Sequence, residues 1–343
     1  MPEGIDEVRV TDWFRANVAS ATPPFEFSLI AGGRSNLTFR VDDAAGRAFV
    51  LRRPPLGHVL ESAHDVGREH RIIAALGANS DTVPVPAALG LCDDPDVNGA
   101  PFMVMSFVEG AVVRDQATAD AIGASARRAS ATSMVEVLAA LHALDPDEAG
   151  LGELGRREAY LERQLNRWHR QFGQTKQREI PAVDEAHRRL LAVAPAQQRA
   201  SIVHGDYRID NTVLDPGGRV IAVLDWELCT LGDPLADLGQ LAVYWTQPGD
   251  PVPDLLGAPI AAGDFPSRDE LIAAYGAASP LDLAELRTYM AFGYWKLACI
   301  LEGVYARYLG GAGGGDESDP AAYATQVPLL AEAAVDLLPP VPA

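Results

Sequence analysis

Hydrophobic and polar positions alternate in short runs over the first third of the chain. These runs are rich in Phe, Val, Leu and Thr and are separated by turn sequences rich in Gly or Asp, a pattern typical of β-strands. The predicted strands span residues 25–30, 36–41, 48–52, 87–92 and 102–108. Between the third and the fourth strand, apolar positions among charged ones predict a short helix over residues 65–76 that ends at Gly77. The pattern therefore indicates an antiparallel sheet with one inserted helix.

Beyond residue 110 the apolar positions recur every three or four residues, which is the period of an amphipathic helix. Such helices are predicted around residues 134–141, 161–172 and 289–309, with strand-like runs at 201–203 and 220–224. We therefore expect an α+β protein with two lobes. The N-terminal lobe, residues 1–107, carries the sheet, and the mostly helical C-terminal lobe spans residues 108–343.

Acidic residues outnumber basic ones, with 47 Asp and Glu against 28 Lys and Arg, so the 343-residue chain has a formal net charge of -19. A field of this sign repels nucleic acid phosphates and anionic membranes, and we expect neither as a partner. The three cysteines form no CxxC pair, the acidic N-terminus has no apolar signal segment, and no apolar run is long enough to span a bilayer. These features predict a cytoplasmic protein.

Two acidic motifs in the second half of the chain carry the strongest chemical signal. Residues 204–211 read HGDYRIDN and residues 223–227 read VLDWE. Phosphoryl transfer from a magnesium-bound nucleotide requires one carboxylate to accept or orient the attacking hydroxyl, and an amide and a second carboxylate to bind Mg²⁺. Asp206, Asn211 and Asp225 supply these groups in that order. Alternatively, Asp206 caps a helix and Asp225 belongs to a turn, which suits either residue alone better than both together.

These motifs resemble those of the aminoglycoside phosphotransferase and choline kinase superfamily, whose catalytic loop has the form H-G-D-x-x-x-x-N. The resemblance implies a bilobal protein-kinase-like fold in which Asp206 is the catalytic base. It also implies that Asn211 and Asp225 are Mg²⁺ ligands and that His204 orders the loop. Arg208, two residues after the base, would stabilise charge on the γ-phosphate, or alternatively form a surface ion pair.

The same resemblance implies phosphate-binding groups in the N-terminal lobe. The loop of residues 32–36 lies between two predicted strands, where backbone N–H groups at Ser35 and Asn36 would cover the phosphates. Two glycines at this place also fit a plain hairpin. Downstream, Arg52 in the run VLRR stands where the kinase strand V-A-I-K has its lysine.

Arginine would take over the work of that lysine because the only two lysines of the chain, Lys176 and Lys296, lie outside this lobe. Strand alternation places Arg52 and Arg53 on opposite faces, and the motif match selects Arg52 to contact the nucleotide. Glu69 on the following helix is the expected acidic partner of Arg52. The alternative for Glu69 is an exposed side chain among other charged helical residues.

Residues 102–110, FMVMSFVEG, resemble a kinase hinge, a strand that runs into the linker between the lobes. Main-chain groups of Ser106 and Val108 would hold the base of the nucleotide there, whereas composition alone indicates only a buried strand. The N-terminal lobe is thus expected to bind the nucleotide, and the C-terminal lobe to carry catalysis and bind the acceptor. Asp237, in the family segment GDPLADL, is expected to be structural and hydrogen-bonded to the backbone of the catalytic loop.

The closest resemblance is to the branch of the superfamily that also occurs fused to acyl-CoA dehydrogenases, through segments such as GGRSNLTFRV, VLRRPP and GDPLADL. It implies a small-molecule phosphotransferase that moves the γ-phosphate of a Mg²⁺-bound nucleotide, ATP with GTP as the alternative, to a hydroxyl of a small acceptor. The alternatives are an aminoglycoside 3'-type phosphotransferase and a catalytically silent nucleotide-binding module. A basic stripe of Arg163, Arg167 and Arg170 would suit an anionic acceptor or be a solvated helix face, and Lys296 is a candidate substrate contact.

Overall fold

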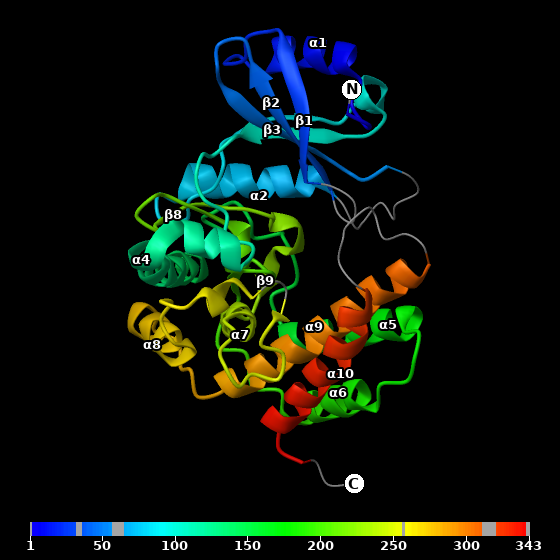
Figure 1. The fold of residues 1–343 in the computed structure, drawn as a ribbon, viewed down its shortest axis with the longest axis vertical. Helices are drawn as coiled ribbons and strands as arrows, with labels where there is room; N and C mark the ends of the chain where they lie inside the picture. The colour runs from blue at the N-terminus through cyan, green and yellow to red at the C-terminus, as the bar shows by residue number, and fades with distance from the viewer. Residues whose placement is uncertain (1, 32–35, 57–64, 256–257, 311–319, 341–343) are drawn as a thin grey trace. The chain divides into compact units, whose positions relative to one another are not determined.

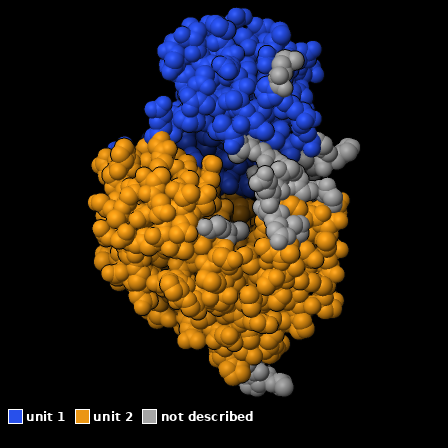
Figure 2. All heavy atoms as spheres, viewed as in Figure 1, with its two compact units in different colours: residues 1–109, 222–227, 313–316 blue, residues 110–221, 228–312, 317–343 orange. Residues whose placement is uncertain are grey.

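The computed structural model describes residues 2–31, 36–56, 65–255, 258–310 and 320–340. The chain divides into two compact units (Figure 2). Unit 1 comprises residues 1–109, 222–227 and 313–316, and unit 2 comprises residues 110–221, 228–312 and 317–343. Ser35, one of the predicted phosphate-binding positions, lies outside the described residues.

Unit 1 contains a five-stranded antiparallel sheet with the strand order β1-β2-β3-β5-β4 (Figure 1). The strands are β1 (Phe25–Ala31), β2 (Leu37–Asp43), β3 (Ala48–Arg53), β4 (Ala88–Cys92) and β5 (Phe102–Ser106). All five strands were predicted from period-two alternation, although β5 ends at Ser106 and not at Val108. Because β5 pairs with both β3 and β4, the predicted hinge segment follows directly from the interior of the sheet.

Three helices belong to the same unit: α1 (Glu7–Asn17), α2 (Val66–Asn79) and α3 (Pro95–Asn98). The predicted helix corresponds to α2, which begins after Asp65, whose side chain accepts a hydrogen bond from the backbone N–H of Arg68. It passes through Gly77 and ends two residues later than expected, since an isolated glycine weakens a helix without stopping it. The helix α1 is not among the predicted elements.

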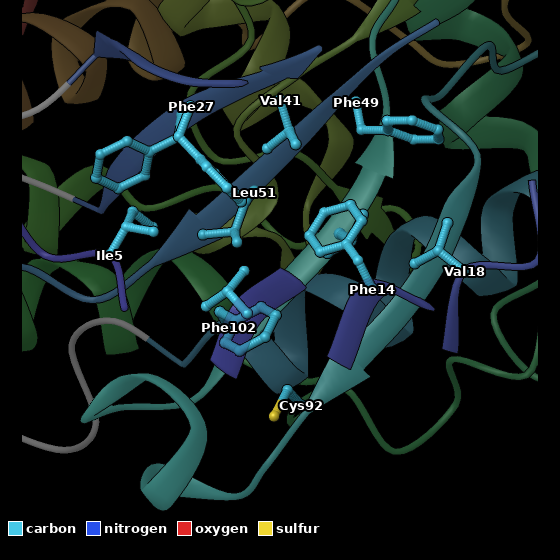
Figure 3. Packing of buried hydrophobic residues seen from close by; sticks show 12 residues of the cluster. Ile5, Phe14, Val18, Phe27, Val41, Phe49, Leu51, Cys92 and Phe102 are labelled. Carbon is cyan, nitrogen blue, oxygen red and sulfur yellow. The ribbon is translucent and has the colours of Figure 1, made fainter. Parts of the chain in front are cut away.

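The core of unit 1 lies between α1 and the sheet (Figure 3). Phe14 of α1 is fully buried, and its ring centroid lies 5.1 Å from that of Phe25, 6.4 Å from that of Phe27 and 6.0 Å from that of Phe49. Aromatic pairs at these separations stabilise a core beyond the area that they bury. The α1 helix is therefore part of the core of this unit, and its packing on β1 and β3 supports the strand that carries Arg52.

Replacing Phe14 with alanine should lower the free energy of unfolding by about 3–5 kcal/mol, because it leaves a cavity among three aromatic rings. The measurement is urea-induced unfolding followed by circular dichroism. Val8→Ala is the control on the same helix, since Val8 is 73% exposed, and it should change the free energy by less than about 0.5 kcal/mol. Equal effects of the two substitutions would contradict the packing described for α1.

Unit 2 is mostly helical (Figure 1). Its helices are α4 (Gln116–Ala143), α5 (Tyr160–Thr175), α6 (Pro181–Val193), α7 (Pro234–Tyr244), α8 (Arg268–Ala278), α9 (Leu286–Leu309) and α10 (Pro320–Leu337). Two small sheets pair β6 (Ser201–Val203) with β9 (Thr230–Gly232), and β7 (Thr212–Leu214) with β8 (Val220–Val223). Within the described ranges, no helix is both long and apolar enough to cross a membrane.

A stacked pair of histidines joins α5 to α6. The rings of His169 and His187 are parallel, with centroids 3.9 Å apart, and His187 also stacks on Trp295 of α9 at 5.6 Å. His169 Nε2 lies 2.7 Å from a carboxylate oxygen of Asp184. Burial, together with the charge of His169, lowers the pKa of His187 from its ordinary 6.5 to about 4.

This pKa shift makes the stability of the protein depend on pH. A histidine with a lowered pKa binds its proton more readily in the unfolded chain, so the folded state loses stability as the pH falls from about 6.5 to about 4. His187→Phe keeps a ring for stacking and removes this titration, so its melting temperature should fall less than that of the wild type over this range. Thermal melts at pH 7, 6, 5 and 4 measure the difference. Parallel curves for the two proteins would contradict the assignment.

Candidate active site

The predicted catalytic loop follows β6 and begins with a backbone conformation that requires glycine. Gly205 has a φ of 83°, and a Cβ atom at this position would lie 2.7 Å from the backbone oxygen of Leu228. The backbone N–H of Asp206 donates a hydrogen bond of 3.2 Å to Nδ1 of the fully buried His204. His204 therefore orders the loop through its ring nitrogen, in the way that the sequence motif predicts.

Asp237 of α7 binds the backbone of this loop, as predicted. One carboxylate oxygen accepts the N–H of His204 at 2.6 Å, and the other accepts the N–H of Gly205 at 2.8 Å. His142 Nε2 lies 3.3 Å from the first of these oxygens. Burial alone would raise the pKa of Asp237, but His142, the charge of His204 and the N–H of Gly205 hold it below its ordinary value. Asp237 thus remains a charged acceptor inside the protein.

The carboxylate of Asp206 has a different environment at each oxygen. Oδ1 accepts hydrogen bonds from Nε2 of Gln240 at 2.9 Å and from the hydroxyl of Tyr244 at 3.1 Å. Oδ2 lies 3.2 Å from Nδ2 of Asn211 and 3.4 Å from Nε of Arg208. The side chain of Asp206 is 21% exposed, so solvent reaches it. One oxygen is thus fixed by two donors on α7, and the other faces the groups of its own loop.

Arg208 forms ion pairs on its own loop. Its Nη2 lies 2.9 Å from a carboxylate oxygen of Asp210, and its guanidinium lies 5.2 Å from the ring centroid of Tyr244. Burial raises the pKa of Asp210, although the charge of Arg208 opposes the shift. A cavity of about 20 Å³ adjoins Arg208, Asp210 and Tyr244, with room for about one water molecule. The side chain of Arg208 is 23% exposed and is held by two carboxylates.

Asn211 and Asp225, the predicted metal ligands, each have an oxygen without a hydrogen bond to the described part of the chain. Nδ2 of Asn211 donates to the backbone oxygen of Asp206 at 2.9 Å, which fixes the amide and leaves its Oδ1 unused. Asp225 has a φ of 64°, a left-handed conformation that is uncommon outside glycine and is tolerated best by Asp and Asn. Its Oδ1 contacts Arg52, whereas its Oδ2 has no hydrogen bond among the described residues.

A cluster of charged side chains in unit 1 surrounds Arg52. Its guanidinium lies 3.2 Å from Glu69, 2.5 Å from Asp225 and 3.4 Å from Glu227. Burial alone would lower the pKa of Arg52, but the three carboxylates raise it above its ordinary value, so this side chain stays charged. Glu69 is buried, and not the exposed residue of the alternative interpretation. Burial raises the pKa of Glu69 to about 7, and Arg52 opposes that shift.

Arg53 lies outside this cluster. Its Nη1 donates hydrogen bonds to the backbone oxygens of Gly4 at 2.5 Å and of Asn98 at 2.9 Å. These bonds tie the end of β3 to the segment before α1 and to the end of α3. The two neighbouring arginines therefore have different tasks: Arg53 holds the backbone, and Arg52 carries the charge of the cluster.

Ser106, Val108 and Asn36 are the remaining described positions of unit 1 that were predicted to contact the nucleotide. The N–H of Ser106 donates to the backbone oxygen of Ala87 at 2.9 Å, and the Ser106 hydroxyl accepts the N–H of Ala87 at 2.9 Å. The main-chain carbonyl of Ser106 takes part in neither of these bonds, and Val108 is half-buried. Asn36 is buried, and neither polar atom of its amide has a hydrogen-bond partner within the described ranges.

Sequence reasoning missed Gln240 and Tyr244 and assigned a different contact to Lys296. Lys296 is 4% exposed, and its ammonium group donates to the Gly205 backbone oxygen and to Oε1 of Gln240, each at 2.7 Å. Its partners are thus protein groups behind the catalytic loop, which corrects the expectation of a substrate contact. The spacing of Asp237, Gln240 and Tyr244, at i, i+3 and i+7, could have shown that they share one helix face. The arginine stripe on α5 is exposed at Arg167 and Arg170 and half-buried at Arg163.

Comparison with known proteins gives three findings. The sequence matches the phosphotransferase enzyme family, APH, over residues 26–286. It is 37% identical over 298 residues to acyl-CoA dehydrogenase family member 10 of Mus musculus, which covers 85% of this chain and 27% of that protein. A crystal structure of a candidate aminoglycoside phosphotransferase from Ralstonia eutropha superposes with a TM-score of 0.78 at 30% identity, covering 97% of this chain and 98% of that chain.

A second solved structure has a lower sequence identity to this chain, and its similarity concerns the fold alone. A thermostable mutant of the aminoglycoside phosphotransferase APH(4)-Ia, solved in complex with ADP and hygromycin B, superposes with a TM-score of 0.62 at 18% identity, covering 94% of this chain and 98% of that chain. These neighbours, with the antiparallel sheet of unit 1 and the helices of unit 2, confirm the predicted α+β, kinase-like fold. The chain spans less than half the length of the curated relatives that it matches.

Asp237→Asn should lower the free energy of unfolding by about 3 kcal/mol. The amide leaves one oxygen for two backbone N–H donors and removes the charge that pairs with His142, and each hydrogen bond to a charged acceptor contributes about 1.5–3 kcal/mol. Urea-induced unfolding measures the change. Asp269→Asn makes the same change of charge at an exposed position in α8, and it should cost less than about 1 kcal/mol. A free energy of unfolding equal to that of the wild type in Asp237→Asn would contradict the role of this carboxylate in holding the loop.

Proposed function

Because the chain belongs to the phosphotransferase enzyme family, we propose that it transfers the γ-phosphate of a magnesium-bound nucleotide to a hydroxyl of a small acceptor, with Asp206 as the base. The observation that carries this proposal is the environment of the Asp206 carboxylate. Two donors on α7 bind Oδ1 of Asp206. The side chain of Asp206, which also carries Oδ2, is partly exposed to solvent. A carboxylate held in this way can accept a proton and keep its orientation.

The proposed reaction is a single displacement. The oxygen of the acceptor hydroxyl forms a bond to the γ-phosphorus, the bond from that phosphorus to the bridging oxygen of the nucleoside diphosphate breaks, and the hydroxyl proton moves to Oδ2 of Asp206. Asn211 holds this oxygen from one side at 3.2 Å. Arg208, whose Nε lies 3.4 Å from the same oxygen, would stabilise the negative charge on the transferred group.

The donor set suits Mg²⁺. Asn211 offers its amide Oδ1 and Asp225 its carboxylate Oδ2, and hard oxygen atoms of this kind are the ligands that Mg²⁺ prefers. The described residues contain no group of three or more His, Cys, Asp or Glu side chains that could hold a metal alone, so phosphate oxygens or water would complete the coordination. When bound, Mg²⁺ would neutralise charge on the phosphates. The left-handed backbone of Asp225 aims its carboxylate, and Arg52 holds the other oxygen of that carboxylate.

Unit 1 is the proposed nucleotide-binding part, and unit 2 the part that carries the base and binds the acceptor. The carbonyl of Ser106 and the main chain of Val108 would contact the base of ATP or GTP. Arg52, held by Glu69, would contact the phosphates, and backbone groups near Ser35 and the buried amide of Asn36 would close the loop over them. The burial and charge of Arg52 and Glu69 support this assignment, because a rigid guanidinium with its own counter-ions binds phosphate with little reorganisation.

Asp206→Asn tests the proposal because the amide keeps the size of the side chain and removes the proton acceptor. We expect kcat for acceptor-dependent ADP release to fall by about 10²- to 10⁴-fold, with the affinity for Mg²⁺-ATP unchanged within about twofold. Coupled ADP detection measures turnover over a panel of hydroxylated metabolites and aminoglycosides, and calorimetry measures nucleotide binding.

The matched control is Asp215→Asn, which makes the same chemical change at a turn residue that binds the backbone N–H groups of Gly217 and Arg219. Its turnover should equal that of the wild type. Undiminished turnover in Asp206→Asn would exclude Asp206 as the base. Binding of Mg²⁺-ATP without ADP release for any acceptor would favour the silent nucleotide-binding module.

A further inference from the structure

Three side chains on one face of α7 hold the predicted catalytic loop, each from a successive turn of the helix. Asp237 accepts the backbone N–H groups of His204 and Gly205. One and two turns further along, Gln240 and Tyr244 donate to Oδ1 of Asp206. Because a helix is rigid over two turns, the backbone of the loop and the carboxylate at its centre are fixed by one body.

The α7 and α9 helices approach each other closely at two glycines. A Cβ atom on Gly239 would lie 2.6 Å from the backbone carbon of Tyr289, and one on Gly293 would lie 3.3 Å from the Cα of Gln240. Any larger side chain would push the helices apart. Lys296 is three residues after Gly293, on the same side of α9, so this close crossing brings its ammonium group to Gln240.

The contact between Lys296 and Gln240 determines which way the Gln240 amide points. An ammonium group only donates hydrogen bonds, so the atom of Gln240 that lies 2.7 Å from Nζ must be the amide oxygen. The amide nitrogen then points to Asp206, where it donates to Oδ1. Without Lys296, the amide could rotate and present its oxygen to the carboxylate, which would replace an attraction by a repulsion.

A lysine in this position is costly for stability alone. Its side chain is 4% exposed, and burial lowers its pKa, although the charges of Asp206 and Asp237 oppose that shift and Arg167 adds to it. Apolar residues of similar volume often replace buried charged groups with no loss of stability. The role of Lys296 is therefore better explained by what it orients than by what it stabilises.

We propose that Lys296 and Gln240 are positioning residues for the base: Lys296 fixes the amide of Gln240, which with Tyr244 occupies Oδ1 of Asp206, so that Oδ2 alone receives the proton of the acceptor hydroxyl. This inference rests on the proposed function. It adds two residues that the catalytic motif does not contain and assigns the proton to one of the two carboxylate oxygens. Neither residue touches the reacting atoms, since both act through Asp206.

The sharpest test is Gln240→Glu. The new carboxylate still accepts a hydrogen bond from Lys296. It has no N–H to donate, however, and it brings a second acceptor against Oδ1 of Asp206. We expect kcat for ADP release from Mg²⁺-ATP, with the acceptor found by the panel, to fall about a hundredfold, the loss typical of a displaced catalytic group. The KM for Mg²⁺-ATP should change by less than about twofold, and circular dichroism should show the wild-type fold at the assay temperature.

Lys296→Met is the second variant, because methionine fills a similar volume without charge. It should also lower kcat with little change in the KM for Mg²⁺-ATP. Combined with Gln240→Glu, it should lower kcat no further than Gln240→Glu alone, because both substitutions break one chain of contacts.

Gln197→Glu is the matched control. Gln197 is a partly buried glutamine that donates to the backbone oxygens of Arg157 and Arg199 and has no contact with Asp206. This variant should keep the wild-type kcat whatever its stability. Wild-type kcat in Gln240→Glu, or a kcat loss that only follows a loss of folded protein, would overturn the inference and leave the proposed function intact. A wild-type protein that releases no ADP with any acceptor would overturn both.

Discussion

The hydrogen bonds between the Asp237 carboxylate and two consecutive N–H groups of the predicted catalytic loop are the interaction on which the candidate active site depends. Peptide groups next to a left-handed glycine have no regular secondary structure to satisfy them, and an unsatisfied buried N–H is costly. A charged acceptor in the first turns of α7 satisfies two of them at once. Because Gln240 and Tyr244 extend from the same helix, the position of Asp206 follows from the position of α7.

The kinase motif V-A-I-K has a lysine where β3 of this chain has Arg52. This difference changes how the charged cluster of unit 1 is built. A lysine would offer one ammonium group to one or two carboxylates, whereas the planar guanidinium of Arg52 reaches Glu69, Asp225 and Glu227 together. This geometry links the predicted partner on α2 to the predicted metal ligand after β8. Arg52 thus orients Asp225, and in the proposed function it would also offer charge to a phosphate, two tasks that a lysine could not combine with the same rigidity.

The sequence was sufficient to predict those helices and strands whose hydrophobic positions follow a clear pattern. The strands are short runs rich in Phe, Val, Leu and Thr between turn sequences, so their positions were predictable. The spacing of the HGD and LDWE motifs singled out Asp206, Asn211 and Asp225 as the candidate base and metal ligands. Helix α1 was missed because Val10 and Phe14 stand among charged residues and give a weak apolar stripe. Lys296 was assigned to the substrate because a lone cation in an apolar helix says nothing about its partner. That partner, Gln240, is set by the crossing of two helices that are far apart in the chain.

The charge of unit 1 gives a reason why a nucleotide would need its metal there. Around the predicted phosphate-binding arginine, the carboxylates of Glu69, Asp225 and Glu227 contact the guanidinium of Arg52. A second guanidinium, that of Arg68, donates to the backbone oxygen of Glu227. The pKa of Glu69 is about 7, so near neutral pH this carboxyl is partly protonated. The two positive charges are therefore offset by the carboxylates of Asp225 and Glu227 and by part of a charge on Glu69. The cluster has no excess positive charge with which to attract a free polyphosphate, in a chain whose overall charge is negative. A divalent cation on Asp225 would make the cluster positive, so metal and nucleotide should bind in a mutually dependent way, and the arginine alone would hold the phosphates only weakly.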